Sequence, residues 1–123
     1  MRSEEWKNQK PNPVRDKSYA FALRVIELYK FLCENEKEYV LSKQLLRSGT
    51  SIGANVEEAI GAQSKRDFGA KMSIAYKESR ETNYRLRLLR DAGYISIPQA
   101  DSVIADCEEL CKIIGSIVRS SNG

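Results

Sequence analysis

The regular spacing of apolar residues is the feature of this sequence that most constrains its fold. Such residues recur every three or four positions in four separate segments, as Phe21, Val25 and Leu28 do in the first of them. Residues at this spacing lie on one face of an α-helix. No alternation of apolar and polar residues extends beyond a few positions, and no internal repeat has the period of a solenoid. The pattern therefore predicts an all-α protein.

Capping residues and helix breakers limit the predicted helices. Asp16 is the expected cap of the first, and Ser64, followed three residues later by Asp67, has the spacing of a capping box. Ser96 begins a second such motif, and Gly93 is placed to end the preceding helix in the left-handed conformation. We expect the following arrangement: a flexible arm at residues 1–15, helices at 17–34, 40–62, 65–91 and 97–119 within a bundle domain of residues 16–120, and a frayed tail at residues 121–123.

The short connections between these helices favour an up-and-down antiparallel four-helix bundle, which buries four apolar faces most economically. The 123 residues suit one such domain, because two domains would each lack a sufficient core. Gly49 and Gly53 each weaken the second helix by about 1 kcal/mol relative to alanine. The apolar spacing continues across both glycines, so we expect a continuous helix that a neighbouring helix approaches closely at these positions.

The composition is typical of a globular protein. Apolar residues make up 41% of the chain and charged residues 30%, a balance unlike that of disordered or membrane proteins. No segment approaches the roughly 20 apolar residues that span a bilayer, and the N-terminus lacks the apolar region of a signal peptide. We therefore expect a cytoplasmic protein with no membrane partner.

The three cysteines, Cys33, Cys107 and Cys111, do not have the spacing of a secreted disulfide framework. Cys107 and Cys111 share a helical face and could, with Cys33, offer three thiolates to zinc. The chain has no histidine to complete a common zinc site, and free cysteines more often pack as small hydrophobic side chains. We expect neither a metal nor another cofactor.

No pattern in the sequence is typical of an enzyme active site. The absence of histidine excludes a Ser-His-Asp triad, a Cys-His pair and the Glu-x-x-His motif of di-iron bundles. No glycine-rich stretch has the spacing of a nucleotide-binding loop. Two pairs of acids, Glu57 with Glu58 and Glu78 with Glu81, are more typical of solvated surfaces than of acid–base sites. We expect no catalytic residues and no small-molecule substrate.

A polar stripe lies beside the apolar face of the second predicted helix, with members at steps of three and four residues. We expect Arg47 to pair with Glu78 or Glu81 of the third helix, and Asn55 to complete a network that fixes helix register. A ligand site is the alternative, although buried ionic groups more often fix register than bind substrates. The residues of this predicted network are Gln44, Arg47, Ser51, Asn55, Glu58, Glu78 and Glu81.

The third predicted helix carries an excess of positive charge. Between Lys65 and Arg90 it has eight bases against three acids, a net charge of +5, whereas residues 98–118 have four acids against one base, a net charge of −3. Arginine forks bind phosphates, and tyrosines such as Tyr76 and Tyr84 can stack on unpaired bases. Alternatively, these charges only solvate the bundle, and some pair with acids of the fourth helix. The candidate nucleic-acid-binding residues are Lys65, Arg66, Lys77, Arg80, Arg87 and Arg90.

Three segments carry a resemblance to a known family: LLRSGTSIGANVEE at residues 45–58, Phe68 with KMSIA at residues 71–75, and ESRETNY at residues 78–84 followed by LRLL. They resemble the four-helix-bundle proteins encoded in intervening sequences of bacterial 23S ribosomal RNA genes. The pattern Arg-Ser-x-x-Ser-Ile-x-x-Asn-x-x-Glu is fairly specific, whereas the first and fourth helices match mainly in their apolar pattern. The resemblance implies an up-and-down bundle, a ring-like homopentamer, and an association with RNA or the ribosome. A similar bundle serves as the accessory protein of diversity-generating retroelements, where a basic surface binds nucleic acid and a reverse transcriptase.

The sequence therefore favours a non-enzymatic, homo-oligomeric bundle that binds RNA or another nucleic acid. The alternative is a protein-interaction scaffold in which the basic third helix docks on the acidic fourth helix of a neighbouring subunit. The pentameric size is an implication of the resemblance alone. An oligomer is also favoured by apolar residues that one slim bundle covers poorly, namely Tyr29, Phe31, Tyr39 and Ile60.

Overall fold

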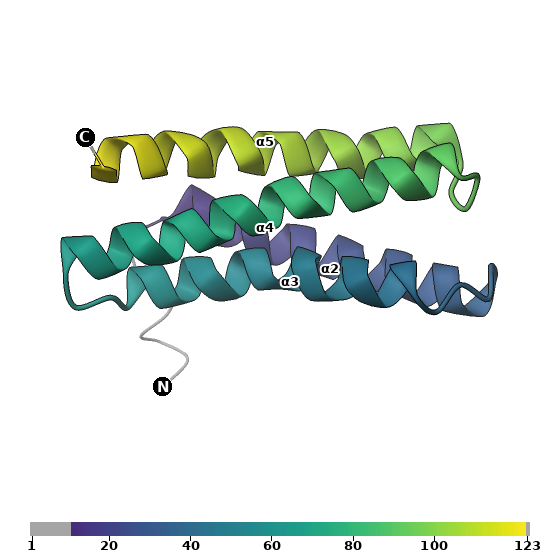
Figure 1. The fold of residues 1–123 in the computed structure, drawn as a ribbon, viewed down its shortest axis with the longest axis horizontal. Helices are drawn as coiled ribbons and strands as arrows, with labels where there is room; N and C mark the ends of the chain where they lie inside the picture. Colours follow the sequence, from purple (N-terminus) through teal and green to yellow (C-terminus); the bar gives the residue numbers. More distant parts are fainter. Residues whose placement is uncertain (1–10, 123) are drawn as a thin grey trace.

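The computed structural model describes residues 11–122, and within this range it contains four helices and no strand. The helices are α2 (Pro13–Glu34), α3 (Leu41–Ile60), α4 (Lys65–Asp91) and α5 (Ile97–Asn122). They run alternately up and down, with α3 packed on α2 and α4, and α5 packed on α4 and α2 (Figure 1). The predicted all-α, up-and-down antiparallel four-helix bundle is confirmed.

The helix boundaries agree with the predicted ones at the end of α2, at both ends of α4 and at the start of α5, and differ elsewhere. The helix α4 has the predicted bounds, whereas α3 ends at Ile60 rather than at residue 62. The helix α2 begins at Pro13, so the part of the predicted arm at residues 13–15 is helical. Residues 121 and 122, predicted as a frayed tail, belong to α5. Residues 11 and 12 of the predicted arm precede the helix, and the remaining arm residues 1–10, like residue 123, lie outside the described range.

The start of α2 differs from the prediction because the capping residue is Asn12, not Asp16. The Asn12 side-chain oxygen accepts a hydrogen bond from the Arg15 backbone N–H at 3.1 Å. Pro13 then occupies the first helical turn, where its fixed φ suits the helix and its missing N–H is not needed. Pro13 therefore helps to begin α2 within the segment that was predicted to be an arm.

The predicted apolar faces form the core. In each helix the residues at three- and four-residue spacing have almost no exposed surface, and a few at the edges, such as Phe68 and Ile113, are partly buried. Burial of such side chains contributes about 25 cal/mol per Å² of apolar surface and is the main force holding the bundle together. Among the largest fully buried side chains are Phe21, Leu32, Leu45, Ile52, Met72, Leu86, Leu89, Leu110 and Ile114.

The helix α3 is continuous through both glycines, as predicted, and Gly49 allows a close approach of α2. A Cβ atom at Gly49 would lie 2.8 Å from both terminal methyl carbons of Val25. At Gly53 the nearest atom, the Ser18 carbonyl oxygen, would be 3.4 Å away, which is an ordinary contact. The tight requirement for glycine therefore falls on Gly49.

Local hydrogen bonds stabilise two of the connections between helices. Gly93 has φ of +85°, the left-handed conformation predicted for it, and the N–H of Tyr94 donates to the Leu89 carbonyl at 2.9 Å. Before α3, the Glu38 carboxylate accepts hydrogen bonds from the backbone N–H groups of the first helical residues. The cap of α3 is thus a glutamate side chain, which the sequence pattern does not predict.

Candidate functional site

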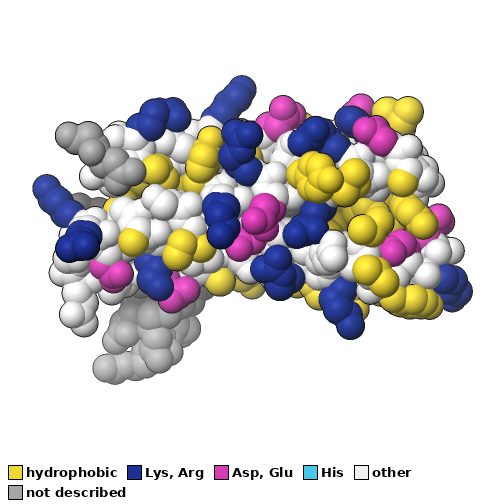
Figure 2. All heavy atoms as spheres, viewed as in Figure 1, with side chains coloured by type: hydrophobic (Ala, Val, Ile, Leu, Met, Phe, Trp, Pro, Cys, Tyr) yellow, Lys and Arg dark blue, Asp and Glu magenta, His cyan; other side chains and the backbone are white. Residues whose placement is uncertain are grey.

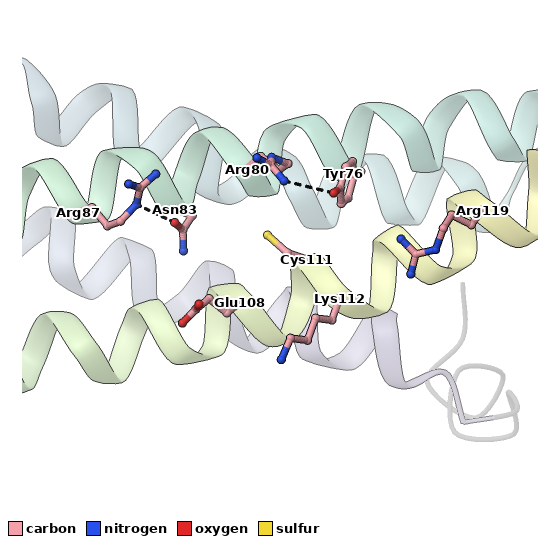
Figure 3. A pocket seen from close by; sticks show the side chains of 8 residues that line it. All are labelled: Tyr76, Arg80, Asn83, Arg87, Glu108, Cys111, Lys112 and Arg119. Carbon is pink, nitrogen blue, oxygen red and sulfur yellow. Dashed lines mark hydrogen bonds between the residues drawn. The ribbon is translucent and has the colours of Figure 1, made fainter.

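A basic hollow lies on the surface between α4 and α5, with a volume of about 380 Å³. Four side chains from α4 line one wall, and four from α5 line the other (Figure 3). We call it the α4–α5 hollow. Its lining contains four bases and one acid, so its local charge is positive. The lining residues are Tyr76, Arg80, Asn83, Arg87, Glu108, Cys111, Lys112 and Arg119.

The two arginines on the α4 wall are held by residues one turn earlier in the same helix. The Arg80 guanidinium donates to the Tyr76 hydroxyl at 3.4 Å and lies 6.0 Å from the centre of the Tyr76 ring. This hydrogen bond is the main reason that the pKa of Arg80 is raised. Arg87 donates to the Asn83 side-chain oxygen at 2.9 Å and lies 5.9 Å from the Tyr84 ring. Both arginines interact here with neutral groups, which do not cancel a positive charge.

Lys112 and Arg119 complete the lining of the hollow from α5, and in Figure 3 the Lys112 side chain extends away from α4. Neither forms an ion pair with another residue in the described range. Neither was predicted as a binding residue, because the net charge of this segment marks it as an acidic helix. Their spacing of seven residues, which places two bases on one helical face, was the signal that could have found them.

The other predicted nucleic-acid-binding residues do not join this hollow. Lys65, Arg66 and Lys77 are exposed on α4 but are not part of the hollow's lining. Arg90 bonds to Asp91 at 2.9 Å and to Asp101 of α5 at 3.1 Å, and these two hydrogen bonds are the main causes of its raised pKa. The predicted basic face is therefore divided, with Arg90 neutralised and Lys65, Arg66 and Lys77 lying apart from Arg80 and Arg87.

Three of the four acids of α5 form ion pairs with other residues of the same chain. Lys17 of α2 contacts Glu109 at 2.9 Å, Arg24 of α2 pairs with Asp106, and Asp101 pairs with Arg90. Figure 2 shows the wider distribution: on the face in view, basic side chains are spread along the bundle among acidic and hydrophobic ones. The basic side chains form no single continuous ridge on this face. The α4–α5 hollow, in contrast, gathers four bases around one acid.

The residues of the predicted polar network on α3 and α4 form several separate contacts and not one connected network. Gln44 accepts a hydrogen bond from Arg85 at 2.8 Å, and Arg85 also approaches Glu81 at 4.0 Å. Arg47 approaches Glu78, also at 4.0 Å, and remains mostly exposed. Glu81, the other partner considered for Arg47, pairs instead with its neighbour on α4.

The remaining members of the predicted network contact other groups. Glu58 pairs with Lys71 of α4 at 3.3 Å. Ser51 and Asn55 hydrogen-bond to backbone carbonyls one turn earlier in α3, at 2.6 and 2.8 Å. The expectation that Asn55 completes an interhelical network is therefore wrong, because its side chain satisfies its own helix. A buried hydrogen bond between α3 and α4 joins Ser48 and Thr82 at 3.0 Å instead.

One carboxylate oxygen of Glu78 and the Nε of Arg85 are buried without a hydrogen-bond partner among the described residues. Glu78 is 9% exposed, and Arg47 at 4.0 Å is too distant for a strong ion pair. Buried polar groups without partners are costly, by about 1–3 kcal/mol each. This part of the α3–α4 surface is thus incompletely satisfied in a single chain.

Two cysteines and a serine form a polar cluster beside the α4–α5 hollow, and of the three only Cys111 is part of its lining. The Cys107 thiol donates to the Ser79 carbonyl at 3.3 Å, and the Cys111 thiol donates to the Ser79 hydroxyl at 3.1 Å. The pKa of Cys111 is lowered to about 6, chiefly because the Cys107 thiol can donate to its thiolate, and further by the Ser79 hydroxyl and the charge of Arg80. The same interaction and burial raise the pKa of Cys107. Cys111 is therefore the ionisable thiol of the pair.

The described residues contain neither a helix apolar and long enough to cross a bilayer nor a group of three or more cysteine, aspartate and glutamate side chains suited to a metal ion.

The family model for the 23S rRNA-intervening sequence protein matches residues 10–116. A protein of unknown function from the S23 ribosomal protein family of Bacteroides thetaiotaomicron VPI-5482 has a crystal structure that is similar, with a TM-score of 0.84 and 52% sequence identity. The match covers 85% of this chain and 97% of that one. No functionally curated protein is significantly similar.

Proposed function

Because the chain belongs to the 23S rRNA-intervening sequence protein family, we propose that it is a non-enzymatic, homo-oligomeric bundle that binds RNA. The proposal includes a cytoplasmic location, which the association of the family's name with 23S rRNA supports. The observation that carries it is the α4–α5 hollow, where four bases surround a single acid.

The chemistry of the hollow suits phosphate groups of a polynucleotide. Arg80 and Arg87 present planar forks of N–H donors, which bind phosphate oxygens through paired hydrogen bonds. Lys112 adds a third positive charge from α5. Tyr84 is 52% exposed and offers a ring on which an unpaired base can stack. This combination of bases and an exposed aromatic ring favours RNA with unpaired residues over a regular duplex.

A filter-binding titration with an RNA hairpin that carries an unpaired loop tests the proposal. The affinity should fall steeply with salt, because each phosphate contact releases a bound counterion. In a Lys112→Gln, Arg119→Gln double variant, the slope of log affinity against log salt should shrink by about one for each phosphate that the variant no longer binds. Affinity that does not depend on salt, or no binding at all, would contradict RNA binding.

The matched control is a Lys30→Gln, Lys43→Gln double variant. Lys30 on α2 and Lys43 on α3 are exposed and lie outside the α4–α5 hollow, so this variant removes the same net charge. We expect its affinity and salt slope to stay close to those of the wild type. Equal decreases in affinity for the two double variants would mean that net charge, and not the hollow, governs binding.

The alternative function is a protein-interaction scaffold in which basic α4 docks on acidic α5 of another subunit. The ion pairs of Asp101, Asp106 and Glu109 within the chain weigh against it, because they leave few α5 acids free. Reversing Arg87 and Arg90 to glutamate separates the two functions. Loss of assembly supports the scaffold, whereas loss of RNA affinity with intact assembly supports RNA binding.

A further inference from the structure

The cysteine pair of the α4–α5 hollow has chemistry that RNA binding does not use. Cys111 is partly exposed, and its sulfur points from α5 across the hollow toward α4 (Figure 3). Cys107 lies one helical turn earlier and is fully buried. Only Cys111 is thus accessible to a molecule that enters the hollow.

The surroundings of Cys111 stabilise its ionised form. Cys107 can donate its S–H to a Cys111 thiolate, the Ser79 hydroxyl lies 3.1 Å from the sulfur, and the Arg80 charge acts on the same side. These interactions lower the pKa of Cys111 below that of an ordinary thiol. The thiolate is the form of cysteine that acts as a nucleophile toward disulfides.

The bases of the hollow would attract an acidic reagent to this thiolate. Arg80, Arg87, Lys112 and Arg119 line the same space as the sulfur, with Glu108 as the only acid. Lys112 and Arg119 have no ion-pair partner in residues 11–122, so their charge is available to a ligand. A volume of about 380 Å³ accommodates a small peptide-sized molecule.

We propose that Cys111 is a thiol-modification site that forms a mixed disulfide with a small acidic disulfide, such as oxidised glutathione. The Cys111 thiolate attacks one sulfur of the reagent, and a new S–S bond forms as the original one breaks. The bonding electron pair leaves with the other half, which takes up a proton from solvent as a thiol. Cys111 is oxidised, the departing half is reduced, and the carboxylates of the bound half lie among the bases. The inference stands independently of RNA binding, because the reaction requires no RNA.

Cys33 is the internal control for this site. It is also partly buried, and its sulfur lies 3.8 Å from the Glu38 carbonyl oxygen. Its neighbours along the chain include Glu34, Glu36 and Glu38, and it is not part of the lining of the α4–α5 hollow. A reagent that reacts according to exposure alone should therefore modify Cys33 and Cys111 to similar extents.

The experiment compares two probes on the full-length protein without RNA: oxidised glutathione, which is negatively charged, and 2-hydroxyethyl disulfide, which is neutral. Peptide mass mapping should place the glutathione adduct on Cys111, and the rate should exceed that of Cys33 by about tenfold or more. A Lys112→Gln, Arg119→Gln variant should react about tenfold more slowly with oxidised glutathione and nearly unchanged with the neutral probe. Far-ultraviolet circular dichroism verifies that the variant is folded.

Two results would overturn the inference. The first is an adduct formed at Cys33 as fast as at Cys111. The second is a double variant in which the reactions of both probes slow by the same factor. The bases would then act only on the Cys111 thiolate and would not attract the acidic reagent. Modification confined to Cys111 in the wild type and abolished in Cys111→Ser supports it.

Discussion

At the scale of single residues, two side chains illustrate how neighbouring groups set a residue's role. Gly49 is required because its missing Cβ makes room for the branched Val25 side chain, which has little rotameric freedom. Cys111 differs from Cys33 not in residue type but in what faces it, a second thiol and an arginine. The role of Gly49 follows from the packing of α3 on α2, and that of Cys111 from Cys107 one turn earlier in α5 together with Ser79 and Arg80 of α4.

Gly49→Ala should destabilise the protein although alanine is the better helix former. The new Cβ would lie 2.8 Å from both terminal methyl carbons of Val25, and overpacking of this kind costs about 1–3 kcal/mol. Gly53→Ala, in the same helix, should be neutral or stabilising by up to about 1 kcal/mol, because its nearest contact is an ordinary 3.4 Å. Urea unfolding of both variants tests this, and equal stability of the two would contradict the packing argument.

The reactivity of Cys111 should depend on pH near neutrality. Because the pKa of Cys111 is lowered to about 6, its thiolate fraction falls as pH drops through that value, and alkylation should slow accordingly. Above about pH 7 the rate should change little, since the thiol is then mostly ionised. Cys107, whose pKa is raised and which is buried, should stay unmodified throughout. The measurement is the rate of iodoacetamide labelling at each cysteine from about pH 5 to about pH 9, and a midpoint near that of an ordinary thiol would refute it.

At the scale of helices, local signals account for most of what the sequence predicted correctly. The apolar stripes and the caps at Ser64 and Ser96 depend on residues within one or two turns, so they can be identified without the fold, and both caps form the predicted bonds. The cap of α3 was not predicted because Glu38 is not a usual capping residue. The basic hollow was only half predicted, since Lys112 and Arg119 acquire their role from the packing of α5 on α4.

Removing the Glu38 carboxylate should weaken the start of α3. Its two oxygens accept bonds from Val40, Leu41 and Ser42 at 3.3, 3.2 and 2.9 Å, so three N–H groups at the helix start would lose their partner. Loss of a cap typically costs about 0.5–2 kcal/mol, and we expect Glu38→Ala to fall in the upper half of that range. Glu38→Gln keeps one acceptor oxygen and should be destabilised less. Glu36→Ala, an exposed neighbour, serves as the control in thermal unfolding, and an equal decrease in stability there would contradict the cap.

At the scale of the whole molecule, the surface of one chain leaves some groups unsatisfied. Tyr39 and Val40, at the turn before α3, are 56% and 68% exposed, and Ile60 at the other end of α3 is 43% exposed. The buried oxygen of Glu78 has no partner within residues 11–122. Of the apolar residues expected to remain uncovered, Phe31 instead packs against the core of its own chain. The remaining exposed groups favour the proposed homo-oligomer.

The proposed assembly predicts a measured mass above that of a 14.0 kDa monomer. Light scattering coupled to size-exclusion chromatography tests this. A Tyr39→Lys, Val40→Lys variant should shift the population toward monomer, because charges at an apolar contact are costly to bury. Substituting Lys at Tyr19, which is 66% exposed on α2, provides a control on a different helix. A wild-type protein that remains monomeric at micromolar concentration would argue against the oligomer.

Which helices contact one another also influences how the chain folds. Each helix contacts the next along the sequence, so most of the bundle can form from neighbouring hairpins, a topology that folds rapidly. The seam between α2 and α5 is the exception, because it joins the first and last helices and is bridged on its surface by Lys17 with Glu109 and Arg24 with Asp106. Ion pairs this exposed contribute little and are screened by salt. Hydrogen exchange should therefore show that the contacts between α2 and α5 open before those between the other helices. These contacts should open more readily as ionic strength rises.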